Sequence, residues 1–234
     1  MNRRPGNYSP GFTDHPVRKG VRPDVNPYLV LHREYPEVIP ADQGPGYKGR
    51  WSEAFGREAP LFLELGAGNG FHLSGMAAQH PESNWLGLEL RFKRVVLIAK
   101  KIRAAGLQNA KILRYNWFYL DDLFEDASLD GLALHHPDPW PKEDQAHNRI
   151  IDPPFVAQVA RLLKPGAEWR MKTDFEPHIE ALLSCAVGQP FEVVGRSMDV
   201  QRDGAPWERD VITNYQRKSY EKGITVYAVA LRRL

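Results

Sequence analysis

Short apolar segments of strand length alternate with longer amphipathic segments from about residue 60 to the end of the chain. The apolar segments, bounded by glycine, proline or polar residues, predict seven strands at 61–65, 85–89, 110–115, 129–134, 167–173, 191–197 and 226–231. Helical spacing of apolar residues predicts helices at 71–79, 91–103, 153–163 and 176–187. Proline and glycine predict a tight turn at 164–166. With right-handed connections, this alternation predicts a doubly wound, seven-stranded, mostly parallel α/β sheet.

The first 60 residues lack this alternation. Residues 1–27 hold five prolines and five basic residues against two acidic ones. So little apolar surface cannot offset the entropy of ordering, so we expect a flexible basic arm, either a solvated tail or an arm that contacts a polyanion. Residues 28–60 mix aromatic residues with proline and glycine and predict an irregular lead-in with one short helix at 51–55. The remaining part, 61–234, is the expected globular domain.

Composition is that of an ordinary globular domain, with 42% hydrophobic and 26% charged residues in 234. A net charge of +2 neither demands nor excludes a nucleic-acid partner. The single cysteine, Cys185, excludes an intramolecular disulfide and a multi-cysteine metal site, and its apolar helical surroundings predict a core position. No apolar run approaches the ~20 residues of a membrane span, and no signal core is present. We therefore expect a soluble cytoplasmic protein.

A glycine-rich turn follows the first predicted strand, in the segment Leu61-Phe62-Leu63-Glu64-Leu65-Gly66-Ala67-Gly68-Asn69-Gly70. The order strand, glycine turn, helix is how a parallel sheet presents its backbone to a nucleotide-like cofactor. Glu89, 19 residues after Gly70 at the end of the second strand, can accept hydrogen bonds from both hydroxyls of a ribose. Dehydrogenases share these features, so they indicate an adenosine-type cofactor and leave the reaction open.

The fourth strand runs into Pro137-Asp138-Pro139-Trp140-Pro141-Lys142. Three prolines stiffen this loop, which therefore holds an acid, an aromatic plane and a cation in set directions. Such a loop suits a planar base; the alternative is a proline-rich turn at the sheet edge. The preceding His135-His136 pair would point to opposite faces of a strand, so we expect no metal site.

The predicted helix at 91–103 carries six basic residues and no acidic one. Basic residues on an amphipathic helix face water in many proteins, and they also contact phosphates in nucleic-acid-binding proteins. Both interpretations stay open at this stage.

Five segments resemble, in order and spacing, the motifs of the bacterial tRNA (guanine-N7)-methyltransferase family, and the resemblance runs from about Pro60 to the C-terminus. These segments are the glycine-rich start, Gly87-Leu88-Glu89, Pro137 to Lys142, Met171-Lys172-Thr173-Asp174-Phe175-Glu176 and Thr213-Asn214-Tyr215-Gln216. The resemblance implies a Rossmann-like class I methyltransferase fold, S-adenosyl-L-methionine as cofactor, and methylation of N7 of a guanine in tRNA, guanine 46 of the variable loop. It leaves a monomer or a homodimer open.

The resemblance also implies roles for individual residues. Gly66, Gly68 and Gly70 would approach the methionine part of the cofactor, with Glu64 beside them. Glu89 would bind the ribose, Asn116 the adenine, and Asp138 would lie between cofactor and base. The substrate positions are Lys142, Asp174, Thr213, Asn214, Tyr215 and Gln216. Because N7 of guanine is a free lone pair, catalysis needs alignment and balance of the developing positive charge, which Asp138 and Asp174 would supply.

Three features depart from the family pattern. First, the dense basic run after Lys142 is reduced, since the segment 143–149 keeps only Arg149 of the family's later basic positions. Second, the usual basic and aromatic lead-in before the first strand is not recognisable. Third, Gln216 stands where the family has a carboxylate. The helix at 91–103, the arm, and Arg217, Lys218 and Lys222 are candidates to replace the lost basic residues, and Glu221 to replace the carboxylate. The pattern predicts that Gln216→Glu preserves or raises activity. Two alternatives follow: a methyltransferase of the same fold with a different substrate, or a catalytically weak RNA-binding protein.

Overall fold

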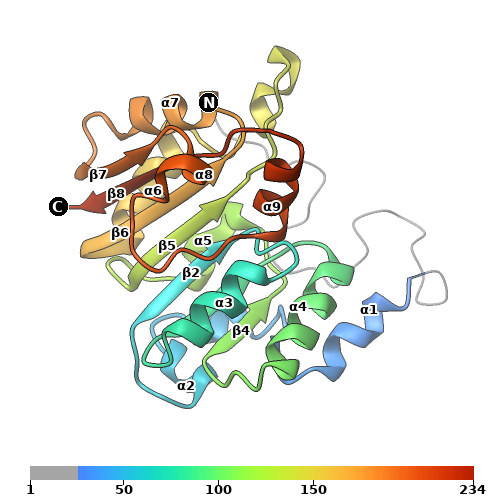
Figure 1. Cartoon of the computed structure of the whole chain (residues 1–234). Helices are drawn as coiled ribbons and strands as arrows, with labels where there is room; N and C mark the ends of the chain where they lie inside the picture. Colours follow the sequence, from blue (N-terminus) through green and yellow to red (C-terminus); the bar gives the residue numbers. More distant parts are fainter. Residues whose placement is uncertain (1–25) are drawn as a thin grey trace. The chain divides into compact units, whose positions relative to one another are not determined.

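The computed structural model describes residues 26–234, which fall into two compact units, the first ending at Glu125 and the second beginning at Asp126 (Figure 1). Residues 1–25 of the predicted arm lie outside the described part. The division into a lead-in at 28–60 and a domain at 61–234 stays a prediction. Within residues 26–234, no helix combines the length and apolar character needed to cross a bilayer.

The first unit is built on four parallel strands in the order β1-β4-β3-β2. They are β1 (Val38–Ile39), β2 (Leu61–Leu65), β3 (Asn84–Leu88) and β4 (Ala110–Leu113). Its helices are α1 (Tyr28–Leu31), α2 (Trp51–Phe55), α3 (Phe71–Gln79), α4 (Phe92–Ala104) and α5 (Leu120–Leu123). Because β2 and β3 are parallel and adjacent, their carboxyl ends bring the glycine turn and Glu89 to one edge.

The lead-in is more ordered than the sequence indicates. The predicted helix at 51–55 is confirmed as α2, and Trp51 anchors it by donating from Nε1 to the carbonyl oxygen of Leu123 (2.9 Å) and stacking on Phe124. The two-residue strand β1 was not predicted because prolines flank it on both sides. It lies at the outside of the strand order, where missing donors are tolerated.

The second unit has the strand order β5-β6-β8-β7. Its strands are β5 (Leu129–His135), β6 (Leu163–Thr173), β7 (Phe191–Ser197) and β8 (Tyr227–Arg233); β5 and β6 are parallel, and β8 runs antiparallel to both of its neighbours. Its helices are α6 (Pro153–Leu162), α7 (Pro177–Ala186), α8 (Val200–Asp203) and α9 (Asn214–Glu221). The seven predicted strands are therefore confirmed, together with the additional β1.

The predicted turn at 164–166 lies within a strand in the structure. Leu129 pairs with Leu163, and the next pair is Gly131 with Glu168, so the residues between them on β6 bulge out of the pairing. Gly166 has a φ of 84°, which explains why the segment has the composition of a turn. A second difference concerns Cys185, which is half-buried on α7 and does not lie in the core.

Helix α9 was not predicted. Of its eight residues only Gln216 and Ser219 are buried, so the segment has no apolar stripe for periodicity to detect. It is stabilised at its start by Thr213, whose hydroxyl accepts a hydrogen bond from the backbone N–H of Gln216 (2.9 Å). This helix carries three of the predicted substrate residues.

Candidate active site

The three glycines after β2 all have positive φ, at 67° for Gly66, 58° for Gly68 and 72° for Gly70, a region that glycine occupies without strain. A Cβ on Gly66 would meet nothing within 4 Å, and one on Gly68 only the carbonyl oxygen of Gly66 at 3.7 Å. A Cβ on Gly70 would approach Ile98 of α4 to 2.9 Å. Gly66 and Gly68 thus leave open backbone for a ligand, whereas Gly70 is required for helix packing.

Glu89 fastens the glycine turn to the end of β3. Its buried carboxylate accepts hydrogen bonds from the backbone N–H groups of Gly68 (3.1 Å), Leu90 and Arg91 (both 2.9 Å). The guanidinium of Arg94 lies 3.6 Å from the same carboxylate. Since a carboxylate offers about four acceptor positions, roughly one remains for a ribose hydroxyl. Its position fits the predicted role, and it also shapes the turn.

Two further cofactor candidates are buried in the first unit. Glu64 on β2 lies 3.2 Å from Nδ1 of His72 on α3. Asn116 follows β4, and its side-chain oxygen accepts a hydrogen bond from the backbone N–H of Phe118 (3.1 Å). Because that oxygen caps the following turn, the amide group of Asn116 has its N–H donors to offer to an adenine.

The loop after β5 presents Asp138 and Lys142 to solvent, and neither side chain makes a hydrogen bond or ion pair within residues 26–234. Arg149 stabilises this loop through two hydrogen bonds. It donates from Nε to the carbonyl oxygen of Trp140 (3.0 Å) and from Nη2 to that of Pro141 (3.3 Å). Arg149, the one basic position of the family that is kept in 143–149, thus stabilises the loop that carries Asp138.

Asp174, directly after β6, lies between two aromatic rings. Tyr215 donates a hydrogen bond to its Oδ2 (3.0 Å), and Nδ1 of His136 lies 3.7 Å from its Oδ1. The ring of His136 also packs on that of Tyr215, with centroids 4.6 Å apart. The interaction with His136, and to a smaller extent the hydrogen bond from Tyr215, lower the pKa of Asp174, whereas burial raises it. Asp174 is therefore ionised at neutral pH.

His136 was considered in the sequence only as a metal ligand, and its place beside Asp174 was missed. The chain leaves the strand at this point, since His136 has a φ of 48°, and its imidazole turns into the protein. Burial lowers the pKa of His136, which keeps it neutral at neutral pH. The only signal in the sequence is its position next to Pro137. In the described residues, no group of three or more His, Cys, Asp or Glu is placed to hold a metal ion.

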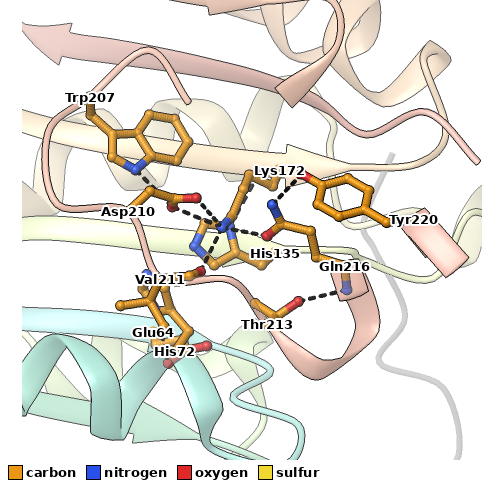
Figure 2. A network of polar contacts seen from close by, with 10 residues as sticks. All are labelled: Glu64, His72, His135, Lys172, Trp207, Asp210, Val211, Thr213, Gln216 and Tyr220. Carbon is orange, nitrogen blue, oxygen red and sulfur yellow. Dashed lines mark hydrogen bonds and ion pairs between the residues drawn. The ribbon is translucent and has the colours of Figure 1, made fainter. Parts of the chain in front are cut away.

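The other substrate candidates on α9 differ in exposure. Tyr215 is 53% exposed and Asn214 is half-buried, whereas Gln216 is only 1% exposed. The side-chain oxygen of Gln216 accepts a hydrogen bond from the ammonium group of Lys172 (2.8 Å), as Figure 2 shows. The structure therefore groups Tyr215 with Asp174 and places Gln216 inside the protein.

Two basic side chains of helix α4 contact other residues of the protein. Arg103 forms two hydrogen bonds with Glu37 (3.0 and 2.9 Å), and the ammonium group of Lys101 lies over the ring of Phe71. Arg91, Lys93 and Lys100 are exposed. In the described residues these three make no ion pair, so they are the residues of α4 that are free to contact phosphates.

The fold is that of a methyltransferase. The profile of a family described as putative methyltransferase matches residues 58–229. Among solved structures, the 16S rRNA methyltransferase KamB superposes with a TM-score of 0.59 at 14% identity, covering 80% of this chain and 94% of that one. The antibiotic-resistance methyltransferase Kmr gives 0.53 at 17%, with 76% and 88% covered. At these identities the likeness establishes the fold alone.

Curated relatives define the family. A tRNA (guanine-N(7)-)-methyltransferase of Streptococcus thermophilus (strain CNRZ 1066) is 30% identical over 213 residues, which is 91% of this chain and 96% of the relative. One of Paracoccus denitrificans is 35% identical over 182 residues, 78% of this chain and 76% of the relative. The chain belongs to the tRNA (guanine-N7)-methyltransferase family.

Proposed function

We propose that this protein transfers the methyl group of S-adenosyl-L-methionine to N7 of a guanine in tRNA, guanine 46 of the variable loop, in the cytoplasm, as a monomer or homodimer. The observation that carries this proposal is the match to relatives of this named activity over nearly the whole length of both chains. The RNA-binding surface would include the exposed residues Arg91, Lys93 and Lys100 of α4.

The residues of the first unit fit the cofactor. Gly66 and Gly68 leave room above their backbones, and Glu89 retains an acceptor position for a ribose hydroxyl. Glu64 and Asn116 would complete the set. When bound, the cofactor supplies an electrophilic methyl group on a sulfonium. The role of the chain is to hold this group in line with the attacking nitrogen.

The residues of the second unit fit a purine that becomes positively charged. The N7 lone pair of guanine attacks without losing a proton first, so no general base is needed. Asp174 is ionised, and Asp138 is exposed and unpaired within residues 26–234, so both can accept hydrogen bonds from the base and balance its charge. Lys142, also exposed, would bind a phosphate or a base oxygen.

Methyl transfer from labelled cofactor into tRNA that lacks the modification tests the proposal. Label in N7-methylguanosine, located to guanine 46 by digestion and mapping of the labelled fragment, is the expected result. Label in another nucleoside would indicate a methyltransferase with a different substrate. Retention of tRNA without label would indicate an RNA-binding protein. Either of the last two results overturns the proposed activity.

A further inference from the structure

The ammonium group of Lys172 on β6 is buried at the centre of a polar network, with the side chain 0% exposed (Figure 2). It donates to both carboxylate oxygens of Asp210 (2.9 and 3.1 Å), to the carbonyl oxygen of Val211 (2.8 Å) and to the side-chain oxygen of Gln216 (2.8 Å). An ammonium has three N–H donors, and these three residues engage them. Burial of such a charge is strongly unfavourable unless a counter-charge compensates it.

Asp210 is the carboxylate in this set. Its Oδ1 also accepts a hydrogen bond from Nε1 of Trp207 (3.1 Å), which fixes the carboxylate in place. Trp207 packs in turn on an apolar cluster that includes Val200 and Val226. The ion pair therefore joins the loop at 205–211 to β6 and does not depend on a mobile side chain.

Gln216 uses both ends of its amide. The oxygen accepts from Lys172, and Nε2 donates to the hydroxyl of Tyr220 (2.6 Å). A glutamate at this position would remove the N–H donor and place a second negative charge on one buried ammonium. Two carboxylates that share one cation repel each other, and one of them would take up a proton more readily.

The residues of the network are close in sequence to those proposed to bind the base. Lys172 precedes Asp174 by two positions, and Gln216 follows Tyr215 in the first turn of α9. Thr213 caps that turn through the backbone N–H of Gln216, and Tyr215 reaches back to Asp174 (3.0 Å). Lys172 therefore links α9 to β6, the strand that Asp174 directly follows.

We infer that Lys172, Asp210 and Gln216 position the base-binding residues Asp174 and Tyr215, with Asp210 supplying the carboxylate of the network and Gln216 a neutral acceptor. For its catalytic consequence this inference rests on the proposed function. It makes Gln216 a positioning residue, and Asp210 a functional residue that the sequence motifs do not include. The family pattern predicts that Gln216→Glu preserves or raises activity, whereas the buried network predicts a loss.

A charge exchange tests the inference. The variants are Gln216→Glu, Asp210→Asn and the double variant Asp210→Asn/Gln216→Glu, with Glu208→Gln as the control because Glu208 is an exposed acid on the same loop. We expect each single variant to lower kcat/KM for tRNA by about tenfold or more and the double variant to recover to within about threefold of the original protein, since interacting residues are not additive. Glu208→Gln should change nothing.

Stability against pH gives a second signature. In Gln216→Glu, the extra carboxylate has a raised pKa in the folded protein, so the loss of stability is relieved as the pH falls. In Asp210→Asn, the buried Lys172 loses the carboxylate of Asp210, which lowers the pKa of its ammonium group, so the loss is relieved as the pH rises. Urea midpoints between pH 5.5 and 9 measure both trends without tRNA, and neither trend is expected for Glu208→Gln.

Positioning has its own readout. The single variants should raise the pKa of Asp174 toward its ordinary value, measured by NMR, because Tyr215 is no longer held against it. Additive losses in the double variant, or a Gln216→Glu variant with unchanged midpoint and kcat/KM, would overturn the inference. If the original protein transfers no methyl group to tRNA, the proposed function fails, while the urea midpoints and the pKa of Asp174 still decide the inference.

Discussion

The hydroxyl of Tyr215 donates a hydrogen bond of 3.0 Å to Oδ2 of Asp174, across 41 positions of the sequence. The nearby imidazole of His136, and then this bond, lower the pKa of Asp174 although burial acts in the opposite direction. The pKa of Tyr215 is raised by burial and by Asp174, so the phenol keeps its proton and remains the donor. Asp174 is therefore held ionised and oriented before any base arrives.

Tyr215→Phe should weaken catalysis through Asp174. The variant keeps the ring beside His136 and removes one hydrogen bond to a charged group, worth about 1.5–3 kcal/mol, so kcat/KM should fall roughly 10- to 100-fold. The pKa of Asp174 should move up toward its ordinary value, which NMR titration of the carboxyl group would detect. Tyr227→Phe is the control, since that hydroxyl makes no hydrogen bond within residues 26–234. An unchanged pKa of Asp174 would contradict the assigned role.

Asp138→Ala should abolish methyl transfer and leave the fold intact. Because Asp138 is exposed and unpaired within residues 26–234, its removal should change the free energy of unfolding by less than about 0.5 kcal/mol. Loss of the group that balances the developing charge should lower kcat by about 100-fold or more. Single-turnover transfer and urea unfolding measure the two quantities. Asp144→Ala, which removes an exposed acid shortly after this loop, should retain activity. Near-normal turnover of Asp138→Ala would exclude the role.

Two glycines of the turn after β2 are expected to differ in role: Gly66 in cofactor binding and Gly70 in helix packing. Gly70→Ala should destabilise the protein by about 2–4 kcal/mol, since its Cβ would press on Ile98 and its φ is positive. Gly66→Ala adds only the cost of positive φ, about 1–2 kcal/mol, and should mainly raise the Kd for the cofactor. Urea unfolding and calorimetric titration with S-adenosyl-L-methionine distinguish the two effects. Equal losses of stability in both variants would contradict the distinction.

Local patterns carried most of the fold and only part of the site. The apolar spacing of Val95, Ala99 and Ile102 predicts α4 because each of these residues is buried. Gln216 could not be placed in the same way, since its burial depends on Lys172, 44 positions earlier. The partnership of Lys172 with Asp210 likewise spans 38 positions. The spacing of apolar residues shows which face of a single helix or strand is buried. Contacts between polar residues that are distant in sequence are formed only in the folded chain.

His178 on α7 provides a pH-dependent test of the second unit. It is buried, with Nδ1 3.0 Å from the hydroxyl of Thr173, and burial lowers its pKa to about 4, with Arg149 acting in the same direction and Asp174 and Asp138 opposing it. The unfolded chain binds a proton near pH 6.5, while the folded chain does not until about pH 4. Stability should therefore be complete above about pH 6.5 and fall steadily as the pH is lowered toward 4.

His178→Asn should flatten this dependence. Asparagine does not titrate and can still hydrogen-bond to Thr173, so the variant should lose less stability than the original protein between pH 7 and pH 4.5. The difference in slope should amount to at most about 3 kcal/mol over that interval. The lowered pKa of His136 acts in the same direction, so some dependence should remain in the variant. Urea unfolding at four or five pH values measures it, and parallel curves for the two proteins would show that His178 is not buried as a neutral imidazole.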